Sequence, residues 1–126
     1  MFLLENEDLI VNEIAPRPHN SGHHTIDSFT ISQYDLQIRA LVGLPLVTPQ
    51  QITPSVLLNV LGDEYTSLMD PYKTNLILKN AHARIYSYGK TDVRPGRKMG
   101  HILFNGPLQE QLLSDAFETH ELLKSA

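Results

Sequence analysis

The 126-residue sequence contains no cysteine and no tryptophan, and no apolar run approaches the roughly 20 residues that cross a bilayer. Without cysteine the chain cannot form disulfides, thiolate zinc sites, iron–sulfur clusters or a cysteine nucleophile. Positive charge is also scarce, because 10 Lys and Arg face 14 Asp and Glu for a net charge of -4. We therefore expect no membrane span and no nucleic-acid partner. The start at Met1 lacks the basic segment of a secretory signal, which predicts a cytoplasmic protein.

The remaining composition, 41% hydrophobic and 19% charged, is that of a globular chain large enough for one modest core. Apolar runs at 2–4 and 8–14, separated by a polar turn, predict a β-hairpin at the N-terminus. Residues 15–25 predict a loop, because Pro16 and Pro18 lack amide donors and cannot continue a helix.

A helix is predicted after this loop. Ser32 and Asp35 match a capping box at its start, and Gly43 is expected to end it. Its apolar face is expected to hold Tyr34, Ile38, Leu41 and Val42.

Strands and helices also alternate in the second half of the chain. Strands are expected over 55–61, 82–88 and 98–104, with helices beginning at Asp70-Pro71 and at Asn105-Gly106-Pro107. The apolar stripe of the last helix is expected to comprise Leu108, Leu112, Leu113, Ala116, Phe117 and Leu123. The predicted fold class is therefore α+β.

The densest polar segment runs from residue 11 to residue 23. Glu13 and Asn20 offer the oxygen ligands that magnesium prefers, and Arg17 offers a fork of donors for a phosphate or carboxylate. This inventory is typical of a site for a magnesium nucleotide. The alternative is a Glu13–Arg17 salt bridge that only stabilises a proline-rich loop.

Three histidines in or beside this segment, His19, His23 and His24, raise the possibility of a zinc site. The spacing of four places His19 and His23 on one face only in a helix, which the neighbouring prolines oppose. We favour loop histidines that hydrogen-bond locally or titrate near neutral pH.

A basic segment occupies residues 88–101 and contains Lys90, Arg94, Arg97 and Lys98, four of the ten cations in the chain. In an acidic protein such a local excess indicates a phosphate or carboxylate site, with Gly89 allowing close approach of the backbone. The alternative is a solvated turn whose charges keep an edge strand from aggregating.

These segments carry a resemblance that covers essentially the whole chain. The matching residues are Asn12-Glu13-Ile14-Ala15-Pro16-Arg17-Pro18-His19-Asn20-Ser21-Gly22-His23, Ser32-Gln33-Tyr34, Arg39-Ala40, Leu44-Pro45, Asn59-Val60-Leu61-Gly62, Tyr88-Gly89-Lys90 and Arg94-Pro95-Gly96-Arg97-Lys98-Met99-Gly100-His101. In these strings the sequence resembles the 5-(carboxyamino)imidazole ribonucleotide synthase family, ATP-grasp ligases of purine biosynthesis. A sister family, formate-dependent glycinamide ribonucleotide transformylase, is similar around 16–19 but usually has Asp-Thr-Gly where this chain has Asn20-Ser21-Gly22.

The resemblance implies that ATP phosphorylates bicarbonate to carboxyphosphate, whose carboxyl group passes to the amine of 5-aminoimidazole ribonucleotide. It implies ATP and Mg²⁺, with Asn12 and Glu13 at the nucleotide and Glu13 and Asn20 at the metal. Arg17 is the implied catalytic residue, since it would stabilise the transferring oxygens.

For the ribonucleotide substrate, the resemblance implies binding of the 5′-phosphate by Lys90, Arg94, Arg97 and Lys98. It assigns no definite role to His19, Ser21, His23 or His101.

The family pattern also extends beyond this sequence, since the family's first metal carboxylate matches a position just before Met1. We expect residues 1–44 to be the C-terminal remnant of an ATP-grasp domain and 45–126 to be a small α+β subdomain, a sheet with one or two packed helices. We also expect the isolated chain to be inactive, to expose apolar surface and to form a homodimer. The alternatives are a non-catalytic module that binds anions or dimerises, and a fragment of a formate-dependent glycinamide ribonucleotide transformylase.

Overall fold

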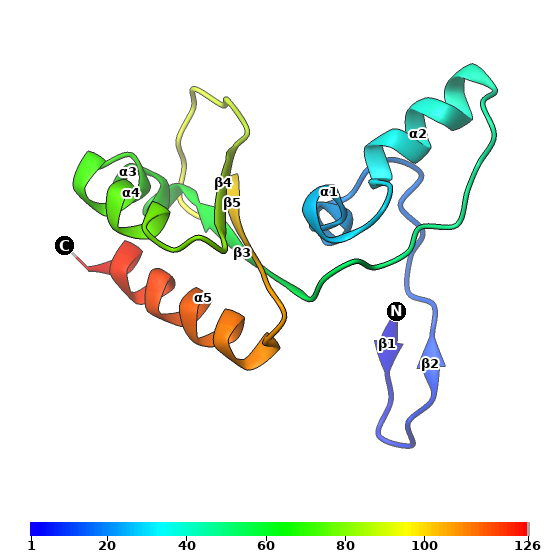
Figure 1. The fold of residues 1–126 in the computed structure, drawn as a ribbon, viewed down its shortest axis with the longest axis horizontal. Coiled ribbons are helices and arrows are strands. Elements are labelled where there is room, and N and C mark those ends of the chain that lie inside the picture. Colours follow the sequence, from blue (N-terminus) through cyan, green and yellow to red (C-terminus); the bar gives the residue numbers. More distant parts are fainter. Residues whose placement is uncertain (126) are drawn as a thin grey trace.

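The computed structural model describes residues 1–125, which form two regions (Figure 1). The N-terminal region, residues 1–44, contains β1 (Phe2–Leu3), β2 (Leu9–Ile10), the 3-10 turn Asn20–Gly22, α1 (Thr25–Ser28) and α2 (Gln33–Val42). The C-terminal region, residues 45–125, contains β3 (Ser55–Leu61), α3 (Gly62–Leu68), α4 (Pro71–Leu78), β4 (Ala83–Ser87), β5 (Lys98–Asn105) and α5 (Gln109–Lys124). The predicted α+β class is confirmed, whereas the boundary at residue 44 stays a prediction.

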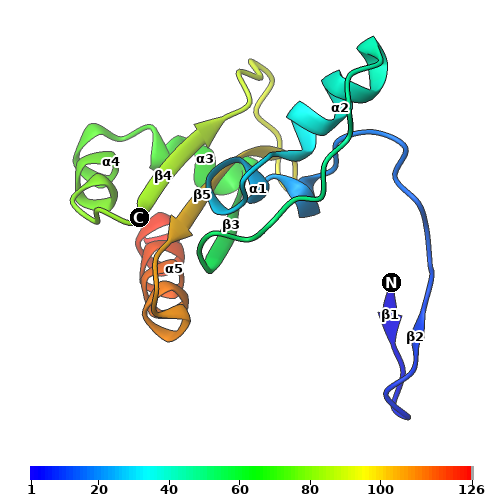
Figure 2. The same ribbon diagram turned by 45° about the vertical axis from the view of Figure 1, so that its right-hand side comes forward.

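The C-terminal region is built on a three-stranded antiparallel sheet in the order β3-β5-β4. The central strand β5 is paired on both sides, and all its residues except Lys98 are buried. Helix α5 packs against β3 and β5, while α3 and α4 lie beside it on the same side of the sheet (Figures 1 and 2). The strand with two neighbours therefore forms the centre of the fold.

The two faces of this sheet differ in polarity because side chains alternate along each strand. One cross-strand row, Leu58–Ile102–Ile85, belongs to the apolar face, which packs on the helices. The adjacent row, Asn59–His101–Tyr86, points to the opposite face. The N-terminal region packs on that polar face, where Asp27 accepts hydrogen bonds from Tyr86 and from Asn105.

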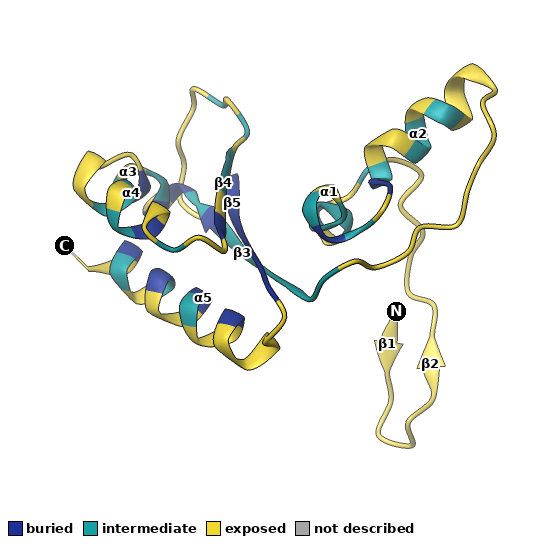
Figure 3. Ribbon diagram, viewed as in Figure 1, coloured by how far each residue is buried: buried dark blue, intermediate teal, exposed yellow. Residues whose placement is uncertain are grey.

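The N-terminal region contains little buried surface (Figure 3). Its short hairpin pairs Phe2 with Ile10 and is exposed throughout. Helix α2 begins with the predicted capping box between Ser32 and Asp35 and ends at Gly43, whose φ of 73° suits a residue without a side chain. Its expected apolar face is also exposed, comprising Tyr34, Ile38, Leu41 and Val42.

Several local predictions are corrected by the structure. Helix α3 was not anticipated; it begins directly after β3 because the Glu64 carboxylate accepts a hydrogen bond from the Leu61 amide. The C-terminal region therefore has three helices rather than one or two. The loop over 15–25 contains the 3-10 turn and the start of α1. The second hairpin strand covers only Leu9–Ile10 of the expected 8–14.

The expected stripe of α5 is also too wide. Its buried positions are Leu112, Ala116, Thr119 and Leu123, which follow the spacing of one helix face. Leu113 and Phe117 lie about 100° further round and are exposed, as is Leu108, which precedes the helix.

No helix in residues 1–125 combines the length and the apolar character that crossing a membrane requires.

Candidate functional site

The candidate site lies where the loop of the N-terminal region meets the polar face of the sheet. Lys98 Nζ donates to Asn20 Oδ1 at 3.2 Å. The amide nitrogen of Asn20 donates to Asn59 Oδ1 at 3.0 Å and to the Tyr88 hydroxyl at 3.4 Å. We call these four residues the junction cluster. Asn20 lies in the loop of the N-terminal region, Asn59 lies in β3, and Tyr88 and Lys98 belong to the basic segment. The fold therefore joins the two segments that the sequence singled out.

A row of stacked rings lies beside the junction cluster. Tyr34 stacks on His23, with ring centroids 5.7 Å apart, and His23 stacks on His101 at 5.4 Å. His101 stacks in turn on Tyr86 at 4.8 Å. The row therefore runs from α2 through the loop to β5 and β4, and it packs the N-terminal region against the sheet.

The two imidazoles in this row are held neutral. Burial, with a smaller effect of the nearby His23, lowers the pKa of His101 from 6.5 to about 4. Burial also lowers the pKa of His23, helped by the charges of His19 and Lys98. His23 Nδ1 lies 2.7 Å from the Tyr34 hydroxyl and 2.8 Å from Gln33 Nε2. Two flanking donors fit an unprotonated nitrogen at that position.

The far end of the row is anchored by a carboxylate. The Tyr86 hydroxyl donates to Asp27 Oδ2 at 2.6 Å, and Arg84 lies 3.8 Å from the other oxygen of that carboxylate. Burial and this hydrogen bond to a negative partner raise the pKa of Tyr86 to about 12. Tyr86 is therefore a structural hydrogen-bond donor and not a general base.

The basic segment forms a loop between β4 and β5. Lys90 Nζ donates to the Lys98 carbonyl at 2.6 Å and lies 5.4 Å from the centre of the Tyr88 ring, within the range of a cation–π contact. Arg94 and Arg97 both form ion pairs with the Asp92 carboxylate. Asp92 thus neutralises part of the charge of the two arginines, whereas Lys98 belongs to the junction cluster and Lys90 lies against its Tyr88 ring.

A close backbone contact holds this loop in place. A side chain at Gly62 would bring a Cβ atom within 1.9 Å of the Arg94 carbonyl oxygen. Gly96 has a φ of 68°, and its amide donates to Asp63 at 3.3 Å. The glycine after β3 therefore leaves room for the backbone of the basic loop.

The other predicted site residues do not join the junction cluster. Asn12, Glu13 and Arg17 lie exposed in the extended segment between β2 and the 3-10 turn. Asn12 accepts a hydrogen bond from the Met1 amine, and Arg17 donates to the Pro18 carbonyl at 3.3 Å. Glu13 forms no ion pair with Arg17 among residues 1–125.

A magnesium site is not formed by the side chains as they stand. Within residues 1–125, no three His, Asp or Glu side chains converge in a way that could hold a metal ion. The Asn20 oxygen, one of the two predicted ligands, faces the Lys98 ammonium, which repels a second cation. The assignment of Glu13 and Asn20 to a metal therefore stays a prediction.

The three loop histidines form separate contacts. His19 Nδ1 lies 2.9 Å from the Ser21 hydroxyl, and His24 Nδ1 lies 3.0 Å from that of Ser28. Together with the contacts of His23, these contacts agree with our interpretation that the histidines form local hydrogen bonds.

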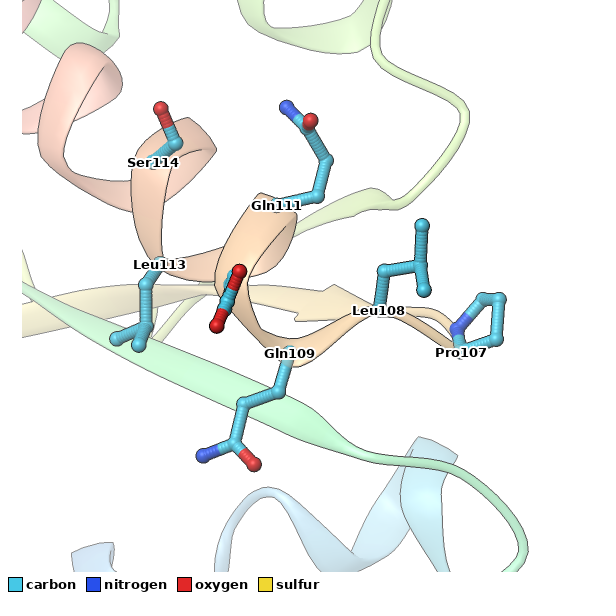
Figure 4. Close-up of a pocket in the computed structure, with 7 residues that line it drawn as sticks. Pro107, Leu108, Gln109, Gln111, Leu113 and Ser114 are labelled. Atoms are coloured by element: carbon cyan, nitrogen blue, oxygen red, sulfur yellow. The ribbon is translucent and has the colours of Figure 1, made fainter.

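A surface hollow lies elsewhere, around the start of α5. It is lined by 107–111, Leu113 and Ser114, none of which was predicted as a site residue. Figure 4 shows Gln109 and Gln111 pointing to opposite sides of the helix, so the polar groups do not converge on one ligand. We therefore place the candidate site at the junction cluster.

Comparison with known proteins gives matches in both the N-terminal and the C-terminal region. The ATP-grasp domain model matches residues 1–34, and the phosphoribosylaminoimidazole carboxylase C-terminal domain model matches residues 55–115. The N5-carboxyaminoimidazole ribonucleotide synthase of Bacillus subtilis is 47% identical over 104 residues, covering 82% of this chain and 26% of that protein. The chain belongs to the N5-carboxyaminoimidazole ribonucleotide synthase family.

Other members of the synthase family agree in sequence and in fold. The phosphoribosylaminoimidazole carboxylase of Ogataea methanolica is 54% identical over 110 residues, covering 81% of this chain and 19% of that protein. The Thermotoga maritima synthetase structure has a TM-score of 0.84 at 36% identity, covering 97% of this chain and 34% of that one.

The Aspergillus clavatus synthase, solved with ADP and 5-aminoimidazole ribonucleotide, has a TM-score of 0.85 at 33% identity. The match covers 99% of this chain and 34% of that chain. The chain spans about a fifth to a third of the length of these relatives and corresponds to the C-terminal portion of the synthase.

Sequence reasoning missed several residues that build the site. Asp92 and Asp27 were not singled out, although they pair with the arginines and with Tyr86. In a strand over 82–88, side-chain alternation places Arg84, Tyr86 and Tyr88 on one face. That signal could have identified the tyrosines, because polar side chains on one face of a strand mark the side away from the core.

Proposed function

We propose that this chain forms part of an ATP-dependent ligase that carboxylates the amine of 5-aminoimidazole ribonucleotide with bicarbonate. In this reaction ATP phosphorylates bicarbonate, and the resulting carboxyphosphate donates its carboxyl group to the amine. Membership of the synthase family supports the proposal, as does the relative solved with ADP and 5-aminoimidazole ribonucleotide.

In this proposal the basic loop binds the 5′-phosphate of the ribonucleotide through Lys90, Arg94, Arg97 and Lys98. The observation that carries the assignment is the hydrogen bond of Lys98 to Asn20, which brings the basic loop and the polar loop into one cluster. Arg94 and Arg97 already have a carboxylate partner in Asp92, so they exchange it for phosphate on binding. The lysines add positive charge without giving up an acidic partner.

The ATP side of the proposed reaction involves the exposed segment before the 3-10 turn. Asn12 and Glu13 contact the nucleotide, and Arg17 stabilises the oxygens that carry charge during phosphoryl transfer. These residues make few contacts within residues 1–125, and the synthases are three to five times longer than this chain. We therefore propose that the 126 residues alone do not catalyse the ligation.

Calorimetric titration of the 126-residue chain with 5-aminoimidazole ribonucleotide tests the phosphate assignment. We expect binding that Lys98→Ala weakens and that Lys79→Ala leaves unchanged, since Lys79 is an exposed lysine after α4 with no ion pair in the described chain. Equal affinities of the two variants would contradict the assignment. Release of phosphate from ATP with bicarbonate would contradict the inactivity of the isolated chain.

A second candidate is a binding module without catalysis. The apolar core lies within the C-terminal region, and the basic loop belongs to that region too. Such a module would bind the ribonucleotide equally well with or without ATP and magnesium, whereas part of a ligase site would respond to them. The same titrations, repeated with ATP and magnesium, separate the two candidates.

A further inference from the structure

Tyr88 connects Asn20 and Lys90 to the central strand β5. Its hydroxyl meets the Asn20 amide, its ring lies under the Lys90 ammonium, and its backbone amide donates to the Met99 carbonyl beside Lys98. The hydroxyl also lies 2.9 Å from Nδ1 of His101. A single side chain thus connects the polar loop, the basic loop and the central strand.

Hydrogen bonds link Lys98 to Asn20, Asn20 to Tyr88 and Tyr88 to His101. The direction of each one follows from the lysine at the end of this series. Lys98 can only donate, so the atom of Asn20 that it meets at 3.2 Å is the amide oxygen. The amide nitrogen of Asn20 therefore faces Tyr88, whose hydroxyl oxygen must accept from it. The single proton of the Tyr88 hydroxyl then points to Nδ1 of His101, the other polar atom within hydrogen-bond range of that hydroxyl.

This direction requires His101 to be neutral with its proton on Nε2. The side chain is 2% exposed, and its Nε2 atom has no hydrogen-bond partner in the described chain. Stacking between His23 and Tyr86 keeps the ring in place. The buried imidazole thus presents a fixed acceptor to Tyr88, and this acceptor acts together with Asn59 Oδ1, which accepts from the same amide nitrogen, to favour the observed orientation of the Asn20 amide.

We propose that Tyr88 and His101 are positioning residues, which orient the Asn20 amide so that the Lys98 ammonium is held ready for the ribonucleotide phosphate. The proposal rests on the proposed phosphate site. Neither residue touches the substrate in this account: His101 acts on Tyr88, Tyr88 on Asn20, and Asn20 on Lys98. Preorganisation of this kind improves affinity because the lysine does not have to be ordered on binding.

The hydrogen-bond direction is tested without any ligand, by nitrogen-15 NMR of the imidazoles and of the Asn20 side-chain amide in the full 126-residue chain. The expected result is a neutral His101 protonated on Nε2 at pH 7, with an Asn20 amide signal that shifts in Tyr88→Phe. The matched control is Tyr72→Phe, which removes the hydroxyl of a tyrosine that is 69% exposed on α4. A His101 protonated on Nδ1, or an Asn20 signal indifferent to Tyr88→Phe, would overturn the proposal.

The effect on binding is tested by titrating the same variants with 5-aminoimidazole ribonucleotide. Tyr88→Phe retains the ring over Lys90, so the expected loss is that of one hydrogen bond, a several-fold to about tenfold weaker affinity. Lys98→Ala should weaken ribonucleotide affinity less in the Tyr88→Phe background than in the parent chain, because the orientation of the Lys98 ammonium is already lost in that background. Unchanged affinity of Tyr88→Phe, or full additivity, would overturn the positioning role.

The two proposals fail in different ways. If the parent chain shows the expected His101 and Asn20 signals but does not bind the ribonucleotide, the proposed phosphate site is wrong while the orienting hydrogen bonds stand. If the parent chain binds and the NMR signals contradict the hydrogen-bond direction, the phosphate site stands and the positioning proposal is wrong.

Discussion

The N-terminal and C-terminal regions differ in how they are held together. Of the twelve buried hydrophobic residues in the described chain, only Ile31 belongs to the N-terminal region. Nine of the other eleven form a core between α3, α4, α5 and the sheet, and the remaining two, Met99 and Leu103, are buried in β5. The C-terminal region is therefore stabilised by its own packing, whereas the N-terminal region depends largely on polar and aromatic contacts with the sheet.

This difference explains where the candidate site lies. One face of the sheet is fully used by the core, and the other is free to present polar side chains to the loop of the N-terminal region. The junction cluster and the stacked rings occupy that second face. A stable sheet thus supplies a rigid support for residues from a region that has little core of its own.

The largest expected effect distinguishes the packing of the two regions directly. Ile102→Ala removes a side chain that is 0% exposed in β5 and is expected to lower the free energy of unfolding by about 2–5 kcal/mol. The matched variant Ile38→Ala changes a residue that is 58% exposed on α2 and should stay within about 0.5 kcal/mol. Urea unfolding followed by circular dichroism measures both. Equal losses would contradict the assignment of the core to the C-terminal region.

The next effect concerns pH and the stacked rings. The unfolded chain protonates His101 below about pH 6.5, whereas the folded chain does so only near pH 4. The contribution of neutral His101 to the free energy of unfolding is therefore complete above pH 6.5. It is lost as the pH falls from 6.5 to about 4. At about 1.4 kcal/mol per pKa unit, the shift corresponds to at most roughly 3 kcal/mol.

The measurement is the free energy of urea unfolding at several values between pH 7 and pH 4, for the parent chain and His101→Gln. The variant should show a flatter profile, while other acid-sensitive groups such as Asp35 affect both proteins alike. Parallel profiles would show that His101 is not buried in its neutral form.

A glycine tests how the basic loop is attached to the core of the C-terminal region. Gly62→Ala places a methyl group against the Arg94 carbonyl and is expected to cost about 1–3 kcal/mol and to weaken ribonucleotide binding. Alanine at an unobstructed helix position would instead raise the melting temperature. A lower melting temperature with weaker ribonucleotide binding would show that the methyl group displaces the loop. A higher melting temperature with unchanged binding would show that the Arg94 carbonyl does not obstruct the start of α3.

The smallest effect compares one helix cap from each region. Ser32→Ala removes the cap of α2, and Asp70→Ala removes the cap of α4; each is expected to cost about 1 kcal/mol. Hydrogen exchange should show the first loss confined to α2 and the second spread over the C-terminal region. The opposite distribution would contradict the difference between the regions.

Much of the fold could be predicted from local sequence signals. The β3 strand, the capping box of α2, the proline start of α4 and the strand β5 follow from patterns that lie within a few residues of each other. The start of α3 could not be predicted in this way, because its cap is a carboxylate within the helix and the preceding residue, Leu61, has no capping side chain.

The candidate site was predicted less completely. The basic and polar segments were identified by charge and composition, but the contact between Asn20 and Lys98 joins residues 78 positions apart. The role of Asp92 depends on the shape of a loop, and the exposure of Leu113 and Phe117 depends on how α5 lies on the sheet. Such contacts follow from tertiary packing and leave no periodic trace in the sequence.

The location of the site is tested most directly by mapping the ribonucleotide onto the 126-residue chain by NMR chemical shifts during a titration. We expect the largest changes at Asn20, Lys90, Arg97 and Lys98, with little change in α5. Changes centred on the hollow at the start of α5, with the junction cluster unaffected, would contradict the claim that the site lies where the two regions meet.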